Sequence, residues 1–112
     1  MKKILLLLCF TTQVNAAQKL DVFQCEVIGY SAEFMMSLIQ HGHDDTTEVL
    51  ESRMEYAPYI VDYYQEMDKD ARSAKIVDYS DIGETVRNFN YKWQDVCKKR
   101  NGIYTKPLEI RK

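Results

Sequence analysis

The sequence predicts an all-α fold, a small bundle of about four helical legs stapled by one disulfide. Three observations predict it. Apolar residues recur at three- and four-residue steps along most of the chain, as they do on the buried face of an amphipathic helix. A proline interrupts one of these stripes, and two cysteines lie near the two ends of the helical region. No segment shows a competing strand pattern.

The first helix is predicted from the stripe Cys25, Ile28, Ala32, Met35 and Ile39. Gly42 follows the last of these residues, at the position where a glycine commonly ends a helix. The segment from Asp45 to Glu48 then has the form of a capping box, an acceptor side chain followed three residues later by Glu. We therefore expect a second helix to begin there.

A proline divides the middle of the chain. A second stripe consists of Leu50, Met54, Ala57, Val61 and Tyr64. Pro58 lies inside it, where proline removes a backbone hydrogen bond and clashes with the preceding turn. We expect the helix to kink or break near Ala57 and a third helical stretch, with another break possible, to cover about 58–79.

The last helix has the clearest pattern. Its stripe is Ile82, Val86, Phe89, Trp93 and Val96, with Cys97 beside it. A second apparent capping box, Asp81 to Glu84, precedes it, and Gly102 follows it. We expect the remaining residues, around Pro107, to form an extended tail.

The cysteine pair restricts the topology. A disulfide between Cys25 and Cys97 would close a loop of about 70 residues and stabilise the fold by about 4 kcal/mol. In a three-helix up-down-up bundle the two sites would be about 20 Å apart. Bonded cysteines need Cα atoms within about 7 Å. An even number of legs satisfies this requirement, and the break at Pro58 supplies the fourth leg.

The first residues have the features of a secretory signal peptide. Lys2 and Lys3 precede an apolar run, and a small residue, Ala16, lies at the expected cleavage site. Cys9 raises the alternative of a lipoprotein, but Leu8 before it is not small. We expect a signal peptide over 1–16, a helical domain over 17–102 and the tail over 103–112, with no membrane-spanning segment after cleavage. An exported chain also fits a disulfide, because its compartment is oxidising.

The net charge of the chain argues against binding to nucleic acid. The chain has a formal net charge of −2, which becomes −4 without Lys2 and Lys3, whereas a nucleic-acid binder shows a dominant basic face. Residues 17–70 hold 12 acids and 3 bases, and residues 71–112 hold 5 acids and 10 bases. The two halves attract each other within the fold, or the acidic half faces a partner.

Both histidines lie in one short stretch, QHGHDDTTE. His41 and His43 with the nearby carboxylates are candidates for zinc or copper. The same residues suit the turn between two helices, because an imidazolium is favourable at a helix C-terminus and carboxylates at the next N-terminus. We favour the turn and expect no metal and no cofactor.

A tyrosine-rich stretch surrounds Pro58. Tyr56, Tyr59 and Tyr63 recur at steps of three and four, and Glu55 and Asp62 lie beside them. Tyrosine suits interfaces because one end of it tolerates water and the other apolar contact. These five residues are our candidates for contact with a protein partner. The alternative is that the tyrosines widen the core.

Several positions together resemble a group of small exported proteins of Gram-negative bacteria and their phages. These positions are Cys25, Ala32, Glu33, Met36, Gln40, Gly42, Phe89 and Cys97. The group has a signal peptide, two framing cysteines and a helical mature domain, and no activity is established for it. Ile39 departs from the arginine expected before the glutamine. The resemblance implies compartment and fold and transfers no active site.

The sequence contains no nucleophile motif, and its two mature cysteines are expected to be bonded, so we expect no enzyme. The leading hypothesis is a non-catalytic periplasmic module that binds another envelope protein as an inhibitor, immunity factor or lysis regulator. The alternative is a periplasmic stress chaperone without a fixed partner. It would expose apolar surface as its many carboxylates become protonated.

Overall fold

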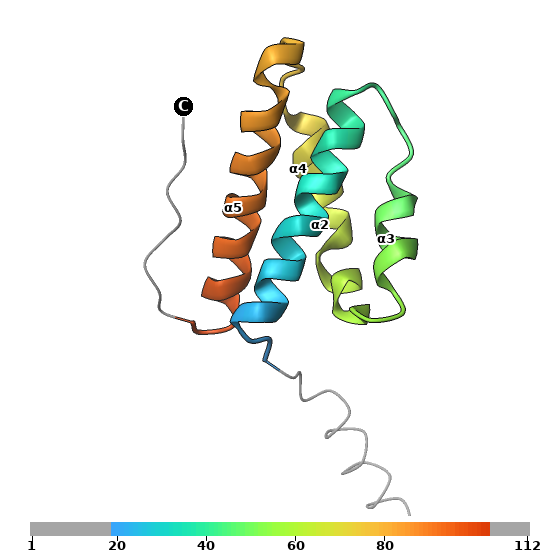
Figure 1. Cartoon of the computed structure of the whole chain (residues 1–112). Helices are drawn as coiled ribbons and strands as arrows, with labels where there is room; N and C mark the ends of the chain where they lie inside the picture. The colour runs from blue at the N-terminus through green and yellow to red at the C-terminus, as the bar shows by residue number, and fades with distance from the viewer. Residues whose placement is uncertain (1–18, 104–112) are drawn as a thin grey trace, which may run out of the picture.

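A computed structural model describes residues 19–103, and these form a four-helix bundle without strands. The helices are α2 (Val22–Gln40), α3 (Thr47–Arg53), α4 (Val61–Ser73) and α5 (Ile82–Arg100), with short 3₁₀ helices η1 (Pro58–Ile60) and η2 (Tyr79–Asp81) before the last two. Successive helices run in alternating directions (Figure 1). The predicted all-α bundle of four legs is confirmed. The signal peptide (1–16) and all of the predicted tail except Ile103 lie outside the described residues.

The two ends of α2 are fixed by local hydrogen bonds. At its start, Asp21 Oδ1 accepts from Gln24 N and Gln24 Oε1 accepts from Asp21 N, both at 2.8 Å. At its end, Gly42 has a φ of 86°, a left-handed conformation that glycine adopts without strain. The amide of His43 donates to the carbonyl of Leu38 (2.9 Å), which completes a Schellman motif. The predicted end of the first helix is therefore confirmed.

The two predicted capping boxes are wrong. Asp45 accepts from the amide and hydroxyl of Thr47 at 2.9 and 2.7 Å, and α3 begins after Thr46 without a side-chain cap. Asp81 does not cap α5 either, because it belongs to η2 and its backbone is helical (φ −100°, ψ −4°) and not extended as in an N-cap residue. The sequence pattern that does form a capping box is the one at Asp21, where Gln replaces Glu.

The break at Pro58 is confirmed, but the stripe predicted across it is buried only in part, at Leu50, Ala57 and Tyr64. The helix α3 ends at Arg53, a turn follows, and Pro58 begins η1, where its missing N–H costs nothing. The turn rotates α4 relative to α3, so that Met54 and Val61 of the predicted stripe are exposed. α4 ends at Ser73, well before 79.

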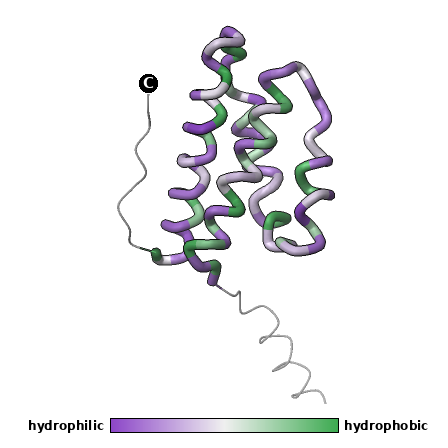
Figure 2. The backbone as a smooth tube through the Cα atoms, viewed as in Figure 1, coloured by the Kyte–Doolittle hydropathy of each residue, from purple (hydrophilic) through white to green (hydrophobic). Residues whose placement is uncertain are grey.

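The helix α2 lies at the centre of the bundle and packs against α5, α4 and α3. This position follows from its composition, because most residues of α2 are hydrophobic and lie on more than one side of it, whereas α5 has more hydrophilic residues (Figure 2). Its first predicted stripe is buried as expected. The core comprises Cys25, Ile28, Ala32, Met35, Met36, Ile39, Val49, Ile60, Tyr63, Met67, Ala71, Phe89, Trp93 and Cys97.

Cys25 and Cys97 form a disulfide, with their Cα atoms 5.5 Å apart. The bond joins the first turns of α2 to the last turns of α5, which meet at the same end of the bundle because the number of legs is even. At this end Asn101 accepts from the Leu20 amide (2.8 Å) and donates to the Cys97 carbonyl (2.7 Å). The two ends of the described chain are thus held together by covalent and hydrogen bonds.

Candidate protein-binding surface

One side of α2 carries apolar residues that no other helix covers fully. Phe23 and Tyr30 are 69% and 58% exposed, and they are seven positions apart, which places them on the same side of the helix. Val27 and Phe34 share this side and are half-buried. We call Phe23, Val27, Tyr30 and Phe34 the aromatic face. Exposed aromatic residues clustered on one surface are typical of protein-binding sites.

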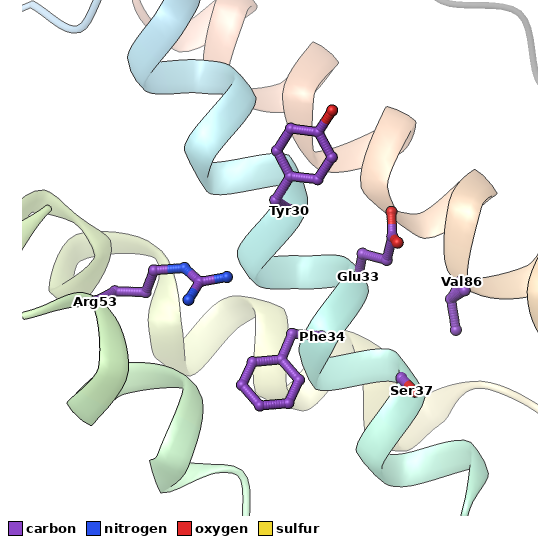
Figure 3. A pocket seen from close by; sticks show the side chains of 6 residues that line it. All are labelled: Tyr30, Glu33, Phe34, Ser37, Arg53 and Val86. Atoms are coloured by element: carbon purple, nitrogen blue, oxygen red, sulfur yellow. The ribbon is translucent and has the colours of Figure 1, made fainter.

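A groove with a volume of about 480 Å³ lies along part of this face. Its floor is formed by Tyr30 and Phe34 of α2, with Glu33 and Ser37 beside them. Arg53 of α3 forms one wall and Val86 of α5 the other (Figure 3). The groove exists because α3 and α5 both pack on α2 from different sides and leave the strip between them open.

The wall formed by Arg53 is positioned by two contacts. Its Nε donates to Ser31 Oγ at 3.1 Å, and its guanidinium carbon lies 5.9 Å from the centre of the Phe34 ring. No carboxylate of residues 19–103 lies within ion-pair distance of Arg53. Arg72 and Arg100, in contrast, pair with Asp68 and Glu66. Arg53 therefore presents to the groove a positive charge that forms no ion pair within residues 19–103.

The other side of the groove carries a negative charge. Glu33 Oε1 accepts from Asn90 Nδ2 at 2.8 Å, and Asn90 Oδ1 accepts from Gln94 Nε2 at 2.7 Å. Asn90 and Gln94 are buried where α5 faces α2, and the Asn90 amide links the Gln94 amide to the Glu33 carboxylate. The second carboxylate oxygen of Glu33 makes no hydrogen bond within the described part of the chain. The groove thus has charges of opposite sign beside an apolar floor.

Tyr56, Tyr59 and Tyr63 do not share one exposed surface. Tyr56 lies in the turn after α3 and is 63% exposed, whereas Tyr63 lies in α4 and is only 6% exposed. The turn and η1 break the helical spacing on which the prediction rested. Tyr63 belongs to the core: its hydroxyl accepts from Asn101 Nδ2 (3.2 Å), and the Arg100 guanidinium lies 5.3 Å from its ring centre. The alternative that the tyrosines widen the core is thus correct for Tyr63.

The other four candidates around Pro58 have different environments. Tyr59 is half-buried, and its pKa is raised first by burial and then by the charges of Asp21 and Tyr56. Glu55 and Asp62 are exposed, as is Tyr56. Contact of these exposed residues with a partner stays a prediction, but they do not form one continuous surface with Tyr63.

The two histidines have different surroundings. His41 Nδ1 lies 2.7 Å from the Ser37 carbonyl oxygen, and its ring meets Tyr79 edge to face at 6.3 Å. His43 lines an acidic hollow of about 790 Å³ with carboxylates of the loop and α3. One of these, Asp45, has its pKa lowered by the Thr47 hydroxyl hydrogen bond. Among residues 19–103, no group of three or more His, Cys, Asp or Glu is arranged to hold a metal ion.

Sequence reasoning missed the aromatic face and Arg53. The signal was present in part, because positions 23, 27, 30 and 34 form a second apolar stripe beside the buried one. Two stripes on one helix indicate that it is covered on more than one side or that one side remains open. Nothing in the sequence, in contrast, indicates that Arg53 would face this stripe.

A comparison with profiles of known families, with curated proteins and with solved structures finds no match for this chain. Within residues 19–103, none of the helices combines the length and apolar character needed to cross a bilayer. The cysteine pair is consistent with an oxidising compartment, since such bonds are rare where thiols are kept reduced.

Proposed function

We propose that this protein is an exported module that binds another protein of the cell envelope through the aromatic face of α2. In this proposal it has no catalytic role and acts as an inhibitor, immunity factor or lysis regulator in the periplasm. The single observation that carries the proposal is the exposure of Phe23 and Tyr30 on the central helix of the bundle.

The argument for binding rests on free energy. Leaving large aromatic side chains in water forgoes about 1.5–3 kcal/mol each relative to burial, so a small domain gains nothing by exposing them for its own stability. Covering them with a partner would recover that free energy. Aromatic residues also lose little conformational entropy on binding, which is why they dominate interface energetics.

The compartment is argued from two features. The N-terminal residues have the pattern of a cleavable signal peptide, and the disulfide is consistent with an oxidising environment. Both features fit the periplasm of a Gram-negative cell. Because the bond fixes α2 against α5, the aromatic face is held in a defined position before a partner arrives, which lowers the entropic cost of binding.

Site-specific photocrosslinking tests the proposal in cells. Tyr30 and Phe23 are each replaced by benzoylphenylalanine, and each variant is produced in a Gram-negative bacterium that naturally encodes the protein and exports it to the periplasm. We expect the same crosslinked partner from both positions. Tyr79, 84% exposed on η2 at the opposite end of the bundle, is the matched control and should give no such product. Equal crosslinking from all three positions, or none from 23 and 30, would contradict the proposal.

A further inference from the structure

We infer that the groove beside Tyr30 receives a peptide segment of the partner in which an apolar side chain lies between a carboxylate and a basic group. The carboxylate faces Arg53 and the basic group faces Glu33. This inference rests on the proposed function and specifies the chemistry of the partner at the same surface.

The carboxylate is assigned from the state of Arg53. Its Nε and Nη1 donate to Ser31 and Ser52 hydroxyls at 3.1 and 3.2 Å, whereas its Nη2 donates to nothing among residues 19–103. A half-buried guanidinium without a carboxylate is an incomplete ion pair, and its planar donors match a carboxylate in particular. The bond to Ser31 and the contact with Phe34 already fix its orientation, so little entropy is lost when a carboxylate binds.

The basic group is assigned from Glu33. Asn90 donates to one of its carboxylate oxygens and holds the side chain at the α5 side of the groove, and the other oxygen accepts no hydrogen bond from residues 19–103. A second carboxylate of the partner would be repelled there, whereas an ammonium or guanidinium would be attracted. The two charges therefore define the direction in which the partner segment lies across α2.

The apolar side chain is assigned from the floor and the size of the groove. Tyr30, Phe34 and Val86 provide apolar surface, and the volume of about 480 Å³ is within the roughly 300–1,000 Å³ of pockets that bury ligands. An apolar anchor surrounded by polar contacts is the usual composition of an interface hot spot. A segment with basic groups alone would place like charge against Arg53.

Selection from a random peptide library displayed on phage, with the oxidised protein as bait, tests the inference. Selected peptides should be enriched in an aromatic or aliphatic residue with Asp or Glu on one side and Lys or Arg on the other. Their affinity should fall about tenfold for Arg53→Gln and change less than twofold for Arg87→Gln, an exposed arginine of α5 outside the groove. Exchange of the peptide's acidic residue for Lys should weaken binding to the unaltered protein similarly.

Enrichment of peptides without a carboxylate, or equal affinity for Arg53→Gln and Arg87→Gln, would overturn the inference. If Arg53→Gln does not fold, the peptide series on the unaltered protein decides the question. Tyr30→Ser separates the two proposals. Peptides that depend on Tyr30 and not on Arg53 would refute the charge assignment and leave the proposed function standing, whereas peptides that depend on neither would contradict both.

Discussion

The helices on the two sides of the groove are attached to α2 in different ways. Against α5, α2 packs along its length, with a disulfide at one end and the hydrogen bond from Asn90 to Glu33 in the middle. The helix α3 is only seven residues long and buries one side chain of its own, Val49. Such a short helix is not stable alone and depends on its few tertiary contacts.

The contrast assigns different roles to the two walls. The α5 wall is fixed, and it holds Glu33 in place through Asn90. The α3 wall is held by the bond from Arg53 to Ser31 and by Thr46, whose hydroxyl bonds Tyr64 and Asp68 of α4. We therefore expect α3 to open locally more often than the rest of the bundle, and partner binding to reduce that opening.

Removing the disulfide should have the largest effect on stability. Replacement of both Cys25 and Cys97 by Ala frees a loop with a sequence separation of 72 and should lower the free energy of unfolding by about 4 kcal/mol. Urea denaturation followed by circular dichroism measures this. A loss below about 1 kcal/mol would show that packing alone fixes the α5 wall and that the covalent bond is not the source of the contrast.

Gly29 is the second test of the α5 side. A β-carbon at this position would overlap side-chain atoms of Asn90 and Gln94 and lie 2.9 Å from the Asn90 carbonyl oxygen. Gly29→Ala should therefore separate the helices and destabilise the fold by about 2 kcal/mol, despite the better helix propensity of alanine.

Gly83→Ala is the matched control for this substitution. Gly83 lies in the first turn of α5 with no atom near the position of a β-carbon. Its replacement should leave the midpoint of thermal unfolding unchanged or raise it, because alanine favours helix by up to about 1 kcal/mol. If both substitutions behaved alike, close approach at Gly29 would not be what limits the α2–α5 contact.

The α2–α5 half of the molecule was largely predictable from the sequence. Its helices are long, their apolar stripes are regular, and Gly42 and Gly102 mark their ends through hydrogen bonds within six residues. The position of the disulfide then required an even number of legs. All of these signals are local or follow from chain connectivity, so the sequence alone predicts this half of the fold.

The α3 half could not be predicted in the same way, because its structure depends on distant residues. Thr46 looked like part of a capping box, but its hydroxyl is used by Asp68, 22 positions away. The spacing of Tyr63 suits either an interface or the core, and the turn before Pro58 places it in the core. Arg53 reaches the aromatic face only because this turn and η1 place α3 beside α2. These contacts are tertiary, and spacing along the chain does not encode them visibly.

Thr46→Val should loosen the α3 wall with a moderate effect on stability. The change keeps the shape of the side chain and removes a hydroxyl that bonds Tyr64 at 2.8 Å and Asp68 at 2.6 Å. The expected loss is about 1–2 kcal/mol. Hydrogen exchange of the α3 amides should accelerate more than that of α5. Thr85→Val, on α5, should have a smaller effect, and equal acceleration in both helices would show that α3 does not open independently.

The smallest expected effect is on the pH dependence of stability. Arg100 makes two bonds to Glu66, at 2.7 and 3.0 Å, and this hydrogen bonding lowers the pKa of Glu66 below its ordinary value of 4.5. A lowered pKa in the folded state means that the pair stabilises the fold above about pH 4.5 and ceases to do so as the pH falls through the folded-state pKa. Because both groups are exposed, the contribution is small.

Glu66→Gln should therefore lower the free energy of unfolding slightly at pH 7 and make it fall less steeply on acidification. Urea titrations at several pH values between 7 and 3 measure both effects, with Glu51→Gln, an exposed carboxylate of α3, as the control. Since this ion pair joins α4 to α5, its loss in acid weakens contacts on the fixed side of the groove. If this variant kept the full acid sensitivity of the unaltered protein, that sensitivity would come from carboxylates of the acidic loop and α3 instead. The two walls would then differ in stability for a second reason.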